Sequence, residues 1–514
     1  MSEDGGHSQS MSSATNLELQ LSCDDAKLDG AVVTRVHGHE EVSRTFLFVA
    51  DLVAPSMETT VEDLEGARVA LRFIENGLET RVVHGFVEAV SERLLIDDGE
   101  PGVGTAATEN KLFAGDQPRL LSLRIVPTLA KLRMVETQTI HLGKSVPEIV
   151  REKLGLFGLQ EPTDFEFRLS RDYEKREFVV QYRETDLAFV ERLLEDAGIA
   201  YFFEHGQTDT IVFCDSNSAF QEAAPLRFDP QGSDAVFSFV RRQQLVPTMV
   251  AVRDYNYRTP LADIAAVHEI EEGLFGGSLD YGSHAKSPEH AAQIAKLRAE
   301  EKLAKRSLFD GKSAVHTLSA GARFTLTDHP LLSRGAPTDL CLLSVDHDYR
   351  RPSALSSSEP GAYRNDFRAL LASVVFRPAR ITPKPRVFGF LTGQVEPVPT
   401  APGAPLLPAQ IDEEGRYWVR FHFDGASNSG VKPSRPIRMA QAHAGAGYGT
   451  HFPLRPGVEV IVAFLDGDPD RPVILGAVPN AVNPSPVNAS RARVSEVVTA
   501  SGIVMQFRDK TLPI

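Results

Sequence analysis

The chain has 514 residues, of which 42% are hydrophobic and 24% are charged. This length predicts about three domains, and the composition is that of a globular protein with ample material for sizeable cores. The formal net charge of −15 argues against a large nucleic-acid footprint and against docking on an anionic membrane. Both of these functions need clustered lysine and arginine.

The sequence offers no export signal or membrane anchor that can be read. No apolar run approaches the roughly 18 residues that a membrane-spanning helix needs, and residues 1–15 are polar, so we expect a disordered tail there. Three cysteines, Cys23, Cys214 and Cys341, lie far apart without a CxxC pair, which predicts reduced thiols. If the protein leaves the cell, we expect it to do so without a cleaved signal.

The stretch from residue 17 to 126 predicts short strands, because apolar and polar residues alternate there with period two. Strands are expected at 45–49, 67–73 and 85–87, and a loop rich in Gly, Asp and Thr at 97–117.

A first helix is predicted after residue 145. Ser145 and Glu148 form an S-x-x-E capping box, apolar residues recur on one face, and Gly155 is expected to end the helix.

Two more helices have clear starts. One is predicted at 186–197, with Thr185 as N-cap and Gly198 as its end, followed by strands at 199–204 and 210–213. The other is expected to begin at Ser287, with Pro288 at its first position, and to reach about Arg306.

The last part of the chain is expected to be all-β. A Ser/Pro/Gly-rich loop at 352–366 and a proline-containing linker at 381–386 come before it. Five strands are predicted, at 388–395, 416–423, 436–441, 458–465 and 473–476. This number of short strands in so short a segment suits an OB-type barrel. We expect that aspartate in place of Phe464 or Gly476 disrupts this barrel.

Two motifs suggest phosphate or calcium binding, but both depart from the full pattern. The tripeptides at 143–145 and 311–313 read Gly-Lys-Ser, but Gln138 and Arg306 stand where a P-loop needs its first glycine. The segment 466–470 begins like an EF-hand loop, but Arg471 and Ala477 replace the required Gly and Glu. We interpret it as an acidic turn.

Other side-chain groups carry weaker signals. The histidines occur without HExxH or a spaced Cys/His set; they are His37, His39, His422, His443 and His451. The Gly-rich segment 425–430 lacks nucleophile-elbow spacing, and paired carboxylates carry no signal without geometry. In the barrel, arginines and Tyr417 fall on opposite strand faces, which disfavours a groove for single-stranded nucleic acid.

Two stretches carry a family resemblance. Residues 176–203, REFVVQYRETDLAFVERLLEDAGIAYFF, resemble the hub segment of VgrG proteins, the spikes of type VI secretion and related contractile injection systems. Residues 464–476, FLDGDPDRPVILG, with RFHFD at 420–424 before them, are similar to the OB domain of the same spikes. With AGARFTL at 320–326, the resemblance spans about residues 16 to 510.

The resemblance implies a mainly β fold with some α-helix (α+β). It implies a disordered tail at 1–15, a phage baseplate hub-like region of β-barrel subdomains with helical insertions at 16–380, and a linker at 381–386. An OB-fold spike domain at 387–485 and the start of a trimeric β-helix needle at 486–514 follow. Within it, Ser495 to Phe507 resemble the opening of the family's triple-stranded β-helix. A lone terminal strand such as Val497 to Phe507 is expected to need two further copies to pair its edges.

The implied function is that of a homotrimeric structural spike that caps an inner tube and punctures the target envelope. The implied partners are a hexameric Hcp-like tube protein, baseplate components and, if the needle is longer, a PAAR-type tip protein and effectors; no cofactor is implied. Assembly is expected in the bacterial cytoplasm, with export by contraction. A cell-wall-degrading tail-spike enzyme and an OB-type binding module are the alternatives. We predict no catalytic, cofactor-binding or metal-ligating residue.

Overall fold

The computed structural model describes residues 16–509, apart from 25–27, 29, 55–58, 95–118, 233–234, 331, 333–335, 352–360, 398–408 and 425–433. The chain divides into two compact units. The first unit comprises 1–134, 150–173 and 190–382, and the second comprises 135–149, 174–189 and 383–514. The predicted tail at 1–15, the loop at 97–117, most of the loop at 352–366 and the Gly-rich segment at 425–430 lie outside the described residues.

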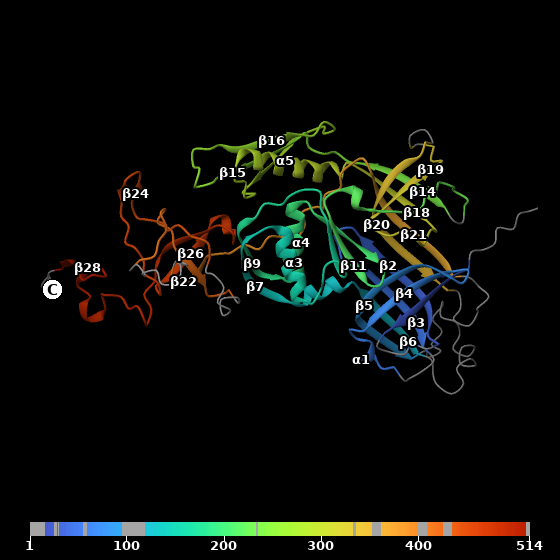
Figure 1. Ribbon diagram of the computed structural model, residues 1–514, viewed down its shortest axis with the longest axis horizontal. Coiled ribbons are helices and arrows are strands. Elements are labelled where there is room, and N and C mark those ends of the chain that lie inside the picture. Colours follow the sequence, from blue (N-terminus) through green and yellow to red (C-terminus); the bar gives the residue numbers. More distant parts are fainter. Residues whose placement is uncertain are drawn as a thin grey trace, which may run out of the picture. The chain divides into compact units, whose positions relative to one another are not determined.

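A curled sheet of 13 strands dominates the first unit (Figure 1). Its main path runs β1-β4-β5-β6-β3-β2-β20-β21-β18-β14, and β19 joins β20 to the short β12 and β13. The strands predicted at 45–49, 67–73 and 85–87 fall within or next to β3, β4 and β5. The bounds are β1 Leu17–Cys23, β2 Val32–Glu41, β3 Leu47–Ala54, β4 Arg68–Glu75, β5 Leu78–Leu94, β6 Arg119–Val126, β12 Gln221–Glu222, β13 Leu226–Arg227, β14 Val236–Gln243, β18 Ser307–Ser313, β19 Ala322–Thr327, β20 Thr338–Arg350 and β21 Ala362–Leu371.

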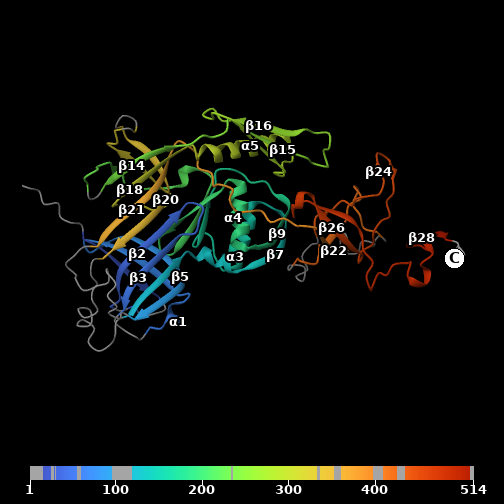
Figure 2. The ribbon, with the colours of Figure 1, turned by 180° about the vertical axis from the view of Figure 1, so that it is seen from behind.

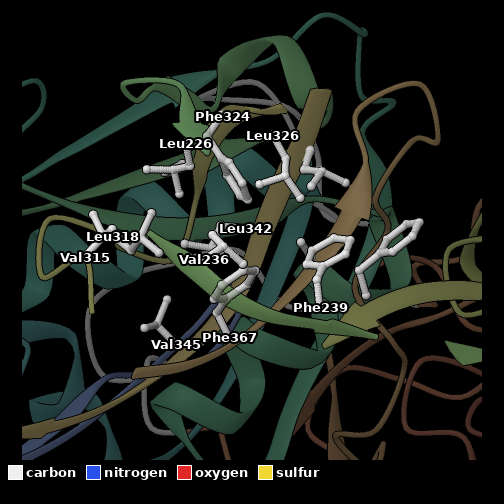
Figure 3. Packing of buried hydrophobic residues seen from close by; sticks show 14 of the residues in the cluster. Leu226, Val236, Phe239, Val315, Leu318, Phe324, Leu326, Leu342, Val345 and Phe367 are labelled. Atoms are coloured by element: carbon white, nitrogen blue, oxygen red, sulfur yellow. The ribbon is translucent and has the colours of Figure 1, made fainter. Parts of the chain in front are cut away.

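One core of this sheet forms where β14, β18, β19, β20 and β21 turn their apolar faces inward (Figure 3). The rings of Phe239 and Phe309 stack with centroids 5.2 Å apart, and Phe324 meets Phe367 edge to face at 6.0 Å. Gly311 allows this packing, because a Cβ at that position would lie 2.2 Å from the Phe367 ring. The second Gly-Lys-Ser tripeptide therefore belongs to a core strand.

Short helical elements and a small sheet accompany the large one. The predicted N-caps are confirmed: Ser145 and Glu148 bond reciprocally at the start of α3 (Val146–Leu156), and Thr185 caps α4 (Asp186–Ala197). Gly155 does not end α3, which runs on to Leu156.

A separate three-stranded sheet has the order β10-β11-β8, formed by β8 Phe165–Arg168, β10 Ala200–His205 and β11 Asp209–Cys214. Shorter helical elements are α1 Val61–Leu64 and the 3-10 helix Thr128–Met134.

The third predicted helix, α5 (Pro288–Leu303), is capped by Ser287 and ends three residues before the expected Arg306. It packs against a three-stranded sheet of order β16-β15-β17, seen beside α5 in Figures 1 and 2. These strands are β15 Met249–Asp254, β16 Ile264–Glu269 and β17 Gly277–Tyr281.

The second unit is built around a four-stranded sheet of order β23-β22-β26-β27. The strands predicted at 416–423 and 458–465 are confirmed, and their alternate residues Tyr417, Val419, Val460 and Val462 are all fully buried. The strand predicted at 436–441 is wrong: Ile437 and Met439 form only isolated bridges, next to a proline that has no N–H to donate. The bounds are β22 Phe390–Glu396, β23 Trp418–Phe421, β26 Glu459–Phe464 and β27 Pro472–Ala477.

A ribbon from the middle of the chain completes the barrel core. Strands β7 (Glu136–Lys144) and β9 (Arg176–Thr185) pair with each other, and Phe178, Val180 and Tyr182 join the same buried cluster as the barrel strands. The barrel is therefore not made from the C-terminal segment alone.

Two small hairpins follow in this unit. One is β24 (Ala444–Gly445) with β25 (Tyr448–Gly449), and the other is β28 (Val494–Val498) with β29 (Val504–Arg508). The lone terminal strand predicted at 497–507 is thus part of an antiparallel pair in the single chain, because a turn at Gly502, with φ of 91°, reverses it.

Two further features bear on the class of protein. Among the described residues, none of the helices combines the length and apolar character needed to cross a membrane. The three cysteines are free thiols, and burial raises the pKa values of Cys214 and Cys341 to about 12.

Phe464 and Gly476 give a matched test of the barrel core. Phe464 is 8% exposed within the core, whereas a Cβ at Gly476 would meet no atom within 4 Å. We therefore expect only the Phe464 variant to disrupt the barrel, because a side chain at Gly476 would enter open space. We predict that Phe464→Asp destabilises the second unit by more than about 3 kcal/mol, because it loses the buried ring and buries a charge. Gly476→Asp should change the urea midpoint little, and equal midpoints for the two variants would refute this core assignment.

Candidate functional site

The chain leaves the first unit through residues 377–382, and a buried carboxylate holds its last two residues. Glu195 lies on α4 with only 3% of its side chain exposed. Its Oε2 accepts hydrogen bonds from the backbone N–H groups of Ile381 and Thr382 at 3.0 and 2.9 Å, and Oε1 accepts from the Thr382 hydroxyl at 2.8 Å. Arg44 balances the charge at 3.1 Å. We call this arrangement the exit anchor.

Arg377 and Arg380 bind the same segment to its surroundings on the N-terminal side of Ile381. Arg377 donates to the Glu300 carboxylate at 2.8 Å and to the carbonyl oxygens of Gly198 and Asp215 at 3.1 and 2.6 Å. Because Arg377 is buried, these bonds satisfy a charge that would otherwise be costly. The exit segment is therefore tied to the end of α4, to the end of β11 and to α5.

Arg380 makes the last of these ties. It pairs with Glu301 on α5 at 3.0 Å and with Asp280 on β17 at 2.7 Å, so it joins the helix to its sheet.

A second anchor holds the linker within the second unit. The ammonium group of Lys384 lies 2.6 Å from Asp468 and 2.7 Å from Asp470. Asp470 is 5% exposed, and its Oδ1 also accepts the Val180 N–H at 2.7 Å. The Val387 N–H donates to the Gly467 carbonyl at 2.8 Å. We call this arrangement the barrel anchor.

The barrel anchor explains the acidic segment 466–470. Asp466 and Gly467 adopt positive φ angles of 55° and 71°, which make a tight turn between β26 and β27. The carboxylates of Asp468 and Asp470 both face Lys384, and Arg471 lies 3.9 Å from Asp468, so two cations accompany the two carboxylates. The interpretation as an acidic turn is confirmed.

The histidines considered as ligands have partners of other kinds. His37 lies 3.3 Å from Asp348, and His39 lies 2.6 Å from Asp346, across the β2–β20 pair. Hydrogen bonds to Glu41 and Asp346 raise the pKa of His39 to about 9. His422 and His451 contact the hydroxyls of Thr392 and Tyr417, and His443 packs on Tyr448.

The remaining candidates are also accounted for. Ser145 of the first Gly-Lys-Ser tripeptide is the helix cap, and Ser313 of the second donates to Asn365 at 2.8 Å. Arg416, Arg420 and Arg435 pair with Asp412, Glu396 and Glu177 at 2.6, 2.6 and 3.2 Å. These barrel arginines face carboxylates, not an open groove.

Sequence reasoning missed a buried ionic cluster in the large sheet. Glu40 pairs with Arg81 at 2.7 Å and with His347 at 3.1 Å, and all three side chains are nearly inaccessible. His347 also contacts the Tyr363 hydroxyl at 2.6 Å. A signal was present, because Glu40 occupies an inward position in the alternation of β2. Only the neighbouring strands reveal its partners.

Burial and charge shift the pKa values around this cluster. Burial alone would raise the pKa of Glu40, but the Arg81 and His347 side chains outweigh it and lower that pKa well below its usual range. Burial, together with Arg81, lowers the pKa of His347. Burial likewise lowers the pKa of His205 to about 3; its Nδ1 accepts the His84 N–H.

These features define a mainly β protein of two compact units, each of which binds its own part of the segment 381–387 by charge-assisted bonds. The phage tail baseplate hub (GPD) family model matches residues 39–353, and the type VI secretion system/phage-baseplate injector OB domain matches 409–478. The chain belongs to the phage tail baseplate hub family.

Individual relatives agree with this assignment. Type VI secretion spike protein VgrG3 of Vibrio cholerae is 29% identical over 91% of this chain and 45% of its own length. VgrG4b of Pseudomonas aeruginosa is 30% identical over 92% of this chain and 57% of its own length. The chain thus spans about half the length of these curated relatives.

A solved structure supports the fold. It is the c3393 protein of E. coli, a type VI secretion component described as structurally similar to the T4 phage tail proteins gp27 and gp5. It superposes with a TM-score of 0.62 at 22% identity, covering 89% of this chain and 100% of its own.

Hydrogen exchange tests the two anchors separately. We predict that Asp470→Ala speeds exchange of the Val180 amide about ten- to hundredfold, the loss of a hydrogen bond to a charged group. The amides of Ile381 and Thr382 should be unchanged in that variant. Glu195→Ala is the reciprocal control, which should speed Ile381 and Thr382 and leave Val180 alone. Parallel changes at all three amides in both variants would show that the anchors are not separate.

Acid should destabilise the first unit. A histidine whose folded pKa is depressed contributes stability that is complete above its unfolded value near 6.5 and is lost as the pH falls toward the folded value, about 3 for His205. We therefore predict that the free energy of unfolding falls between pH 6.5 and 4, with at most about 1.4 kcal/mol per pH unit from each such histidine.

The control is His205→Gln, which keeps an acceptor for the His84 N–H. Urea titrations at several pH values should show a shallower pH slope in this variant. An unchanged slope would mean that His205 does not titrate as its burial implies.

Proposed function

We propose that this chain is the structural hub and spike subunit of a contractile, type VI-like secretion machine, acting as a homotrimer and not as an enzyme. The observation that carries the proposal is the order of modules, with a baseplate hub segment at 39–353 and an injector OB domain at 409–478 in one chain. In this arrangement the spike caps the inner tube and punctures the target envelope when the sheath contracts.

The proposed module boundaries are a hub at 16–380, a linker at 381–386, an OB domain at 387–485 and the start of a needle at 486–514. The exit and barrel anchors support a mechanical role. They hold residues 381–382 and 384–387 by charge-assisted bonds, each set within its own unit.

The terminal hairpin gives trimerisation a physical reason. Val497, Met505 and Phe507 lie on one face and are 41, 60 and 60% exposed. On the opposite face, Glu496 is enclosed and bonds to Gln506 at 2.9 Å. A two-stranded ribbon with a bare apolar face is marginal by itself. Three copies can bury these faces against one another.

The proposed partners follow from this assembly. They are a hexameric Hcp-like tube protein, baseplate components and, on a longer needle, a PAAR-type tip protein and effectors. We propose assembly in the bacterial cytoplasm and export by contraction without a signal peptide.

Mass in solution tests the proposal. Light scattering behind a sizing column should give a species of three times the 56.3 kDa chain mass. Met505→Lys with Phe507→Lys should shift the equilibrium toward monomer at low concentration, because the apolar face is lost. Leu78→Lys, at the first residue of β5 and 73% exposed, is the matched control and should leave the mass unchanged. A monomer at every concentration would overturn trimerisation through this chain.

A further inference from the structure

His205 lies where two sheets of the first unit meet. It is the last residue of β10, in the sheet β10-β11-β8, and its Nδ1 accepts the backbone N–H of His84 on β5 at 3.1 Å. Its ring meets Phe46 edge to face, with centroids 5.3 Å apart. Its Nε2 is enclosed and has no hydrogen-bond partner among the described residues. The imidazole therefore joins β10 to the curled sheet through the lone pair of Nδ1.

This arrangement suits only the neutral form of the ring. Because Nδ1 accepts a hydrogen bond, the one ring proton is on Nε2, and a second proton would have to bind Nδ1. Nδ1 and the His84 N–H would then both be donors, so the bond between β10 and β5 would break. An imidazolium can therefore form only after the ring has moved away from the His84 amide.

The charged groups around the ring also oppose a second proton. Arg81 and the side chain of His84, both on β5, repel a positive charge there. Glu40 on β2 attracts it, but this carboxylate already pairs with Arg81 at 2.7 Å and with His347 at 3.1 Å. Asp209, opposite the ring on β11, already accepts two hydrogen bonds from the segment after β6. Both carboxylates are therefore engaged elsewhere.

The turn that follows β2 is fixed on β10. Ser43 donates its N–H to the Tyr201 carbonyl at 2.7 Å, and the Tyr201 N–H donates to the Ser43 hydroxyl at 3.3 Å. Ser43 has a positive φ of 66°, so these bonds hold the turn in a shape that few residues adopt. At the end of the turn, Phe46 packs edge to face on both Phe203 and His205. A movement of the His205 ring therefore disturbs this turn.

The same turn carries the charge partner of the exit anchor. Arg44, two residues before Phe46, lies 3.1 Å from the carboxylate of Glu195. Glu195 is 3% exposed, and a carboxylate at that depth is costly without its cation. A shift of the turn would therefore weaken the hydrogen bonds that Ile381 and Thr382 donate to this carboxylate.

We propose that acid opens the junction between β5 and β10 at His205 and thereby loosens the exit anchor before the first unit unfolds. The trigger is the second proton on the imidazole, and the turn 43–46 carries its effect to Glu195. The result is a linker that the first unit holds at neutral pH and releases in acid. The proposal does not depend on the trimer or on the secretion machine, because every residue in it belongs to the first unit of one chain.

The pKa values of His205 in the closed and open junction determine the size of the effect. The pKa is about 3 in the closed junction, and it returns to the usual 6.5 when the ring is released. The closed junction is therefore fully favoured above pH 6.5. Below that pH, the open fraction rises by up to about tenfold for each pH unit until the pH reaches about 3. Between pH 7.5 and 5.0 the open fraction should rise by about thirtyfold.

Hydrogen exchange of the whole chain at pH 7.5 and 5.0, corrected for the intrinsic exchange rate at each pH, tests the proposal. The protection of the His84, Ile381 and Thr382 amides should fall by up to about thirtyfold in acid. The Val180 amide of the barrel anchor is the internal control and should change little. His205→Gln keeps an acceptor for the His84 N–H but takes up no proton there, so the pH effect should disappear at all three amides. His205→Asn serves the same purpose if the glutamine variant folds poorly.

A second variant separates the trigger from its transmission. Phe46→Leu removes the ring that lies between His205 and the turn. Acid should still expose the His84 amide in this variant, but Ile381 and Thr382 should lose less protection than in the unaltered chain. A full response at these two amides would overturn the role of the turn. His422→Gln, in the second unit, is the matched histidine control and should show the unaltered pattern.

Each outcome decides the proposal. A pH effect at His84 without one at Ile381 and Thr382 would overturn the link to the exit anchor. A pH effect that persists in His205→Gln would belong to another group, such as Glu191 on α4, and would overturn the trigger. Equal losses of protection along all strands of the first unit would show global unfolding in acid, and no loss at any amide would show that the junction does not open. Either result would overturn the proposal.

Discussion

The second unit depends on the bonds of one buried carboxylate. Asp470 accepts the Val180 N–H across 290 residues of sequence, and it pairs with Lys384 of the linker. Burying this charge without such partners would cost free energy. The acidic turn, the β7–β9 ribbon and the linker must therefore come together. Arg435, which donates to the Asp470 carbonyl at 3.4 Å, closes the arrangement from a fourth segment.

Glu195 is a buried carboxylate of the first unit whose charge is likewise balanced by partners. It binds two successive N–H groups of the departing chain, as a carboxylate does at a helix N-terminus, but here the acceptor comes from α4 and the donors from the exit segment. The two anchors leave Pro383 as the residue between the gripped positions, and a proline restricts the backbone further. Each end of this segment is therefore held by charge-assisted bonds within its own unit.

Local signals in the sequence were sufficient for most single elements. Capping residues located α3, α4 and α5, and period-two alternation located the core residues of β23 and β26. Neighbouring residues did not determine how distant segments combine. Nothing near Phe178 or Val180 indicates that they complete a barrel more than 200 residues later. Likewise, Glu40 is a charged residue on the inward face of β2, and only the fold shows that Arg81 and His347 on other strands are its partners.

The same limit explains why assembly surfaces are hard to recognise. Alternation predicts a strand whether its apolar residues face a core or a partner, so Val267 and Met505 look like core positions in the sequence. Only the folded chain shows that α5 covers the other face of the β15 sheet and that Glu496 is enclosed on the other face of the hairpin, which leaves Val267 and Met505 exposed. Apolar side chains that remain exposed on rigid strands, after the core is complete, lower the free energy only when another molecule covers them. In this chain they occur on two separate sheets, one in each compact unit, so both units carry a physical reason to associate.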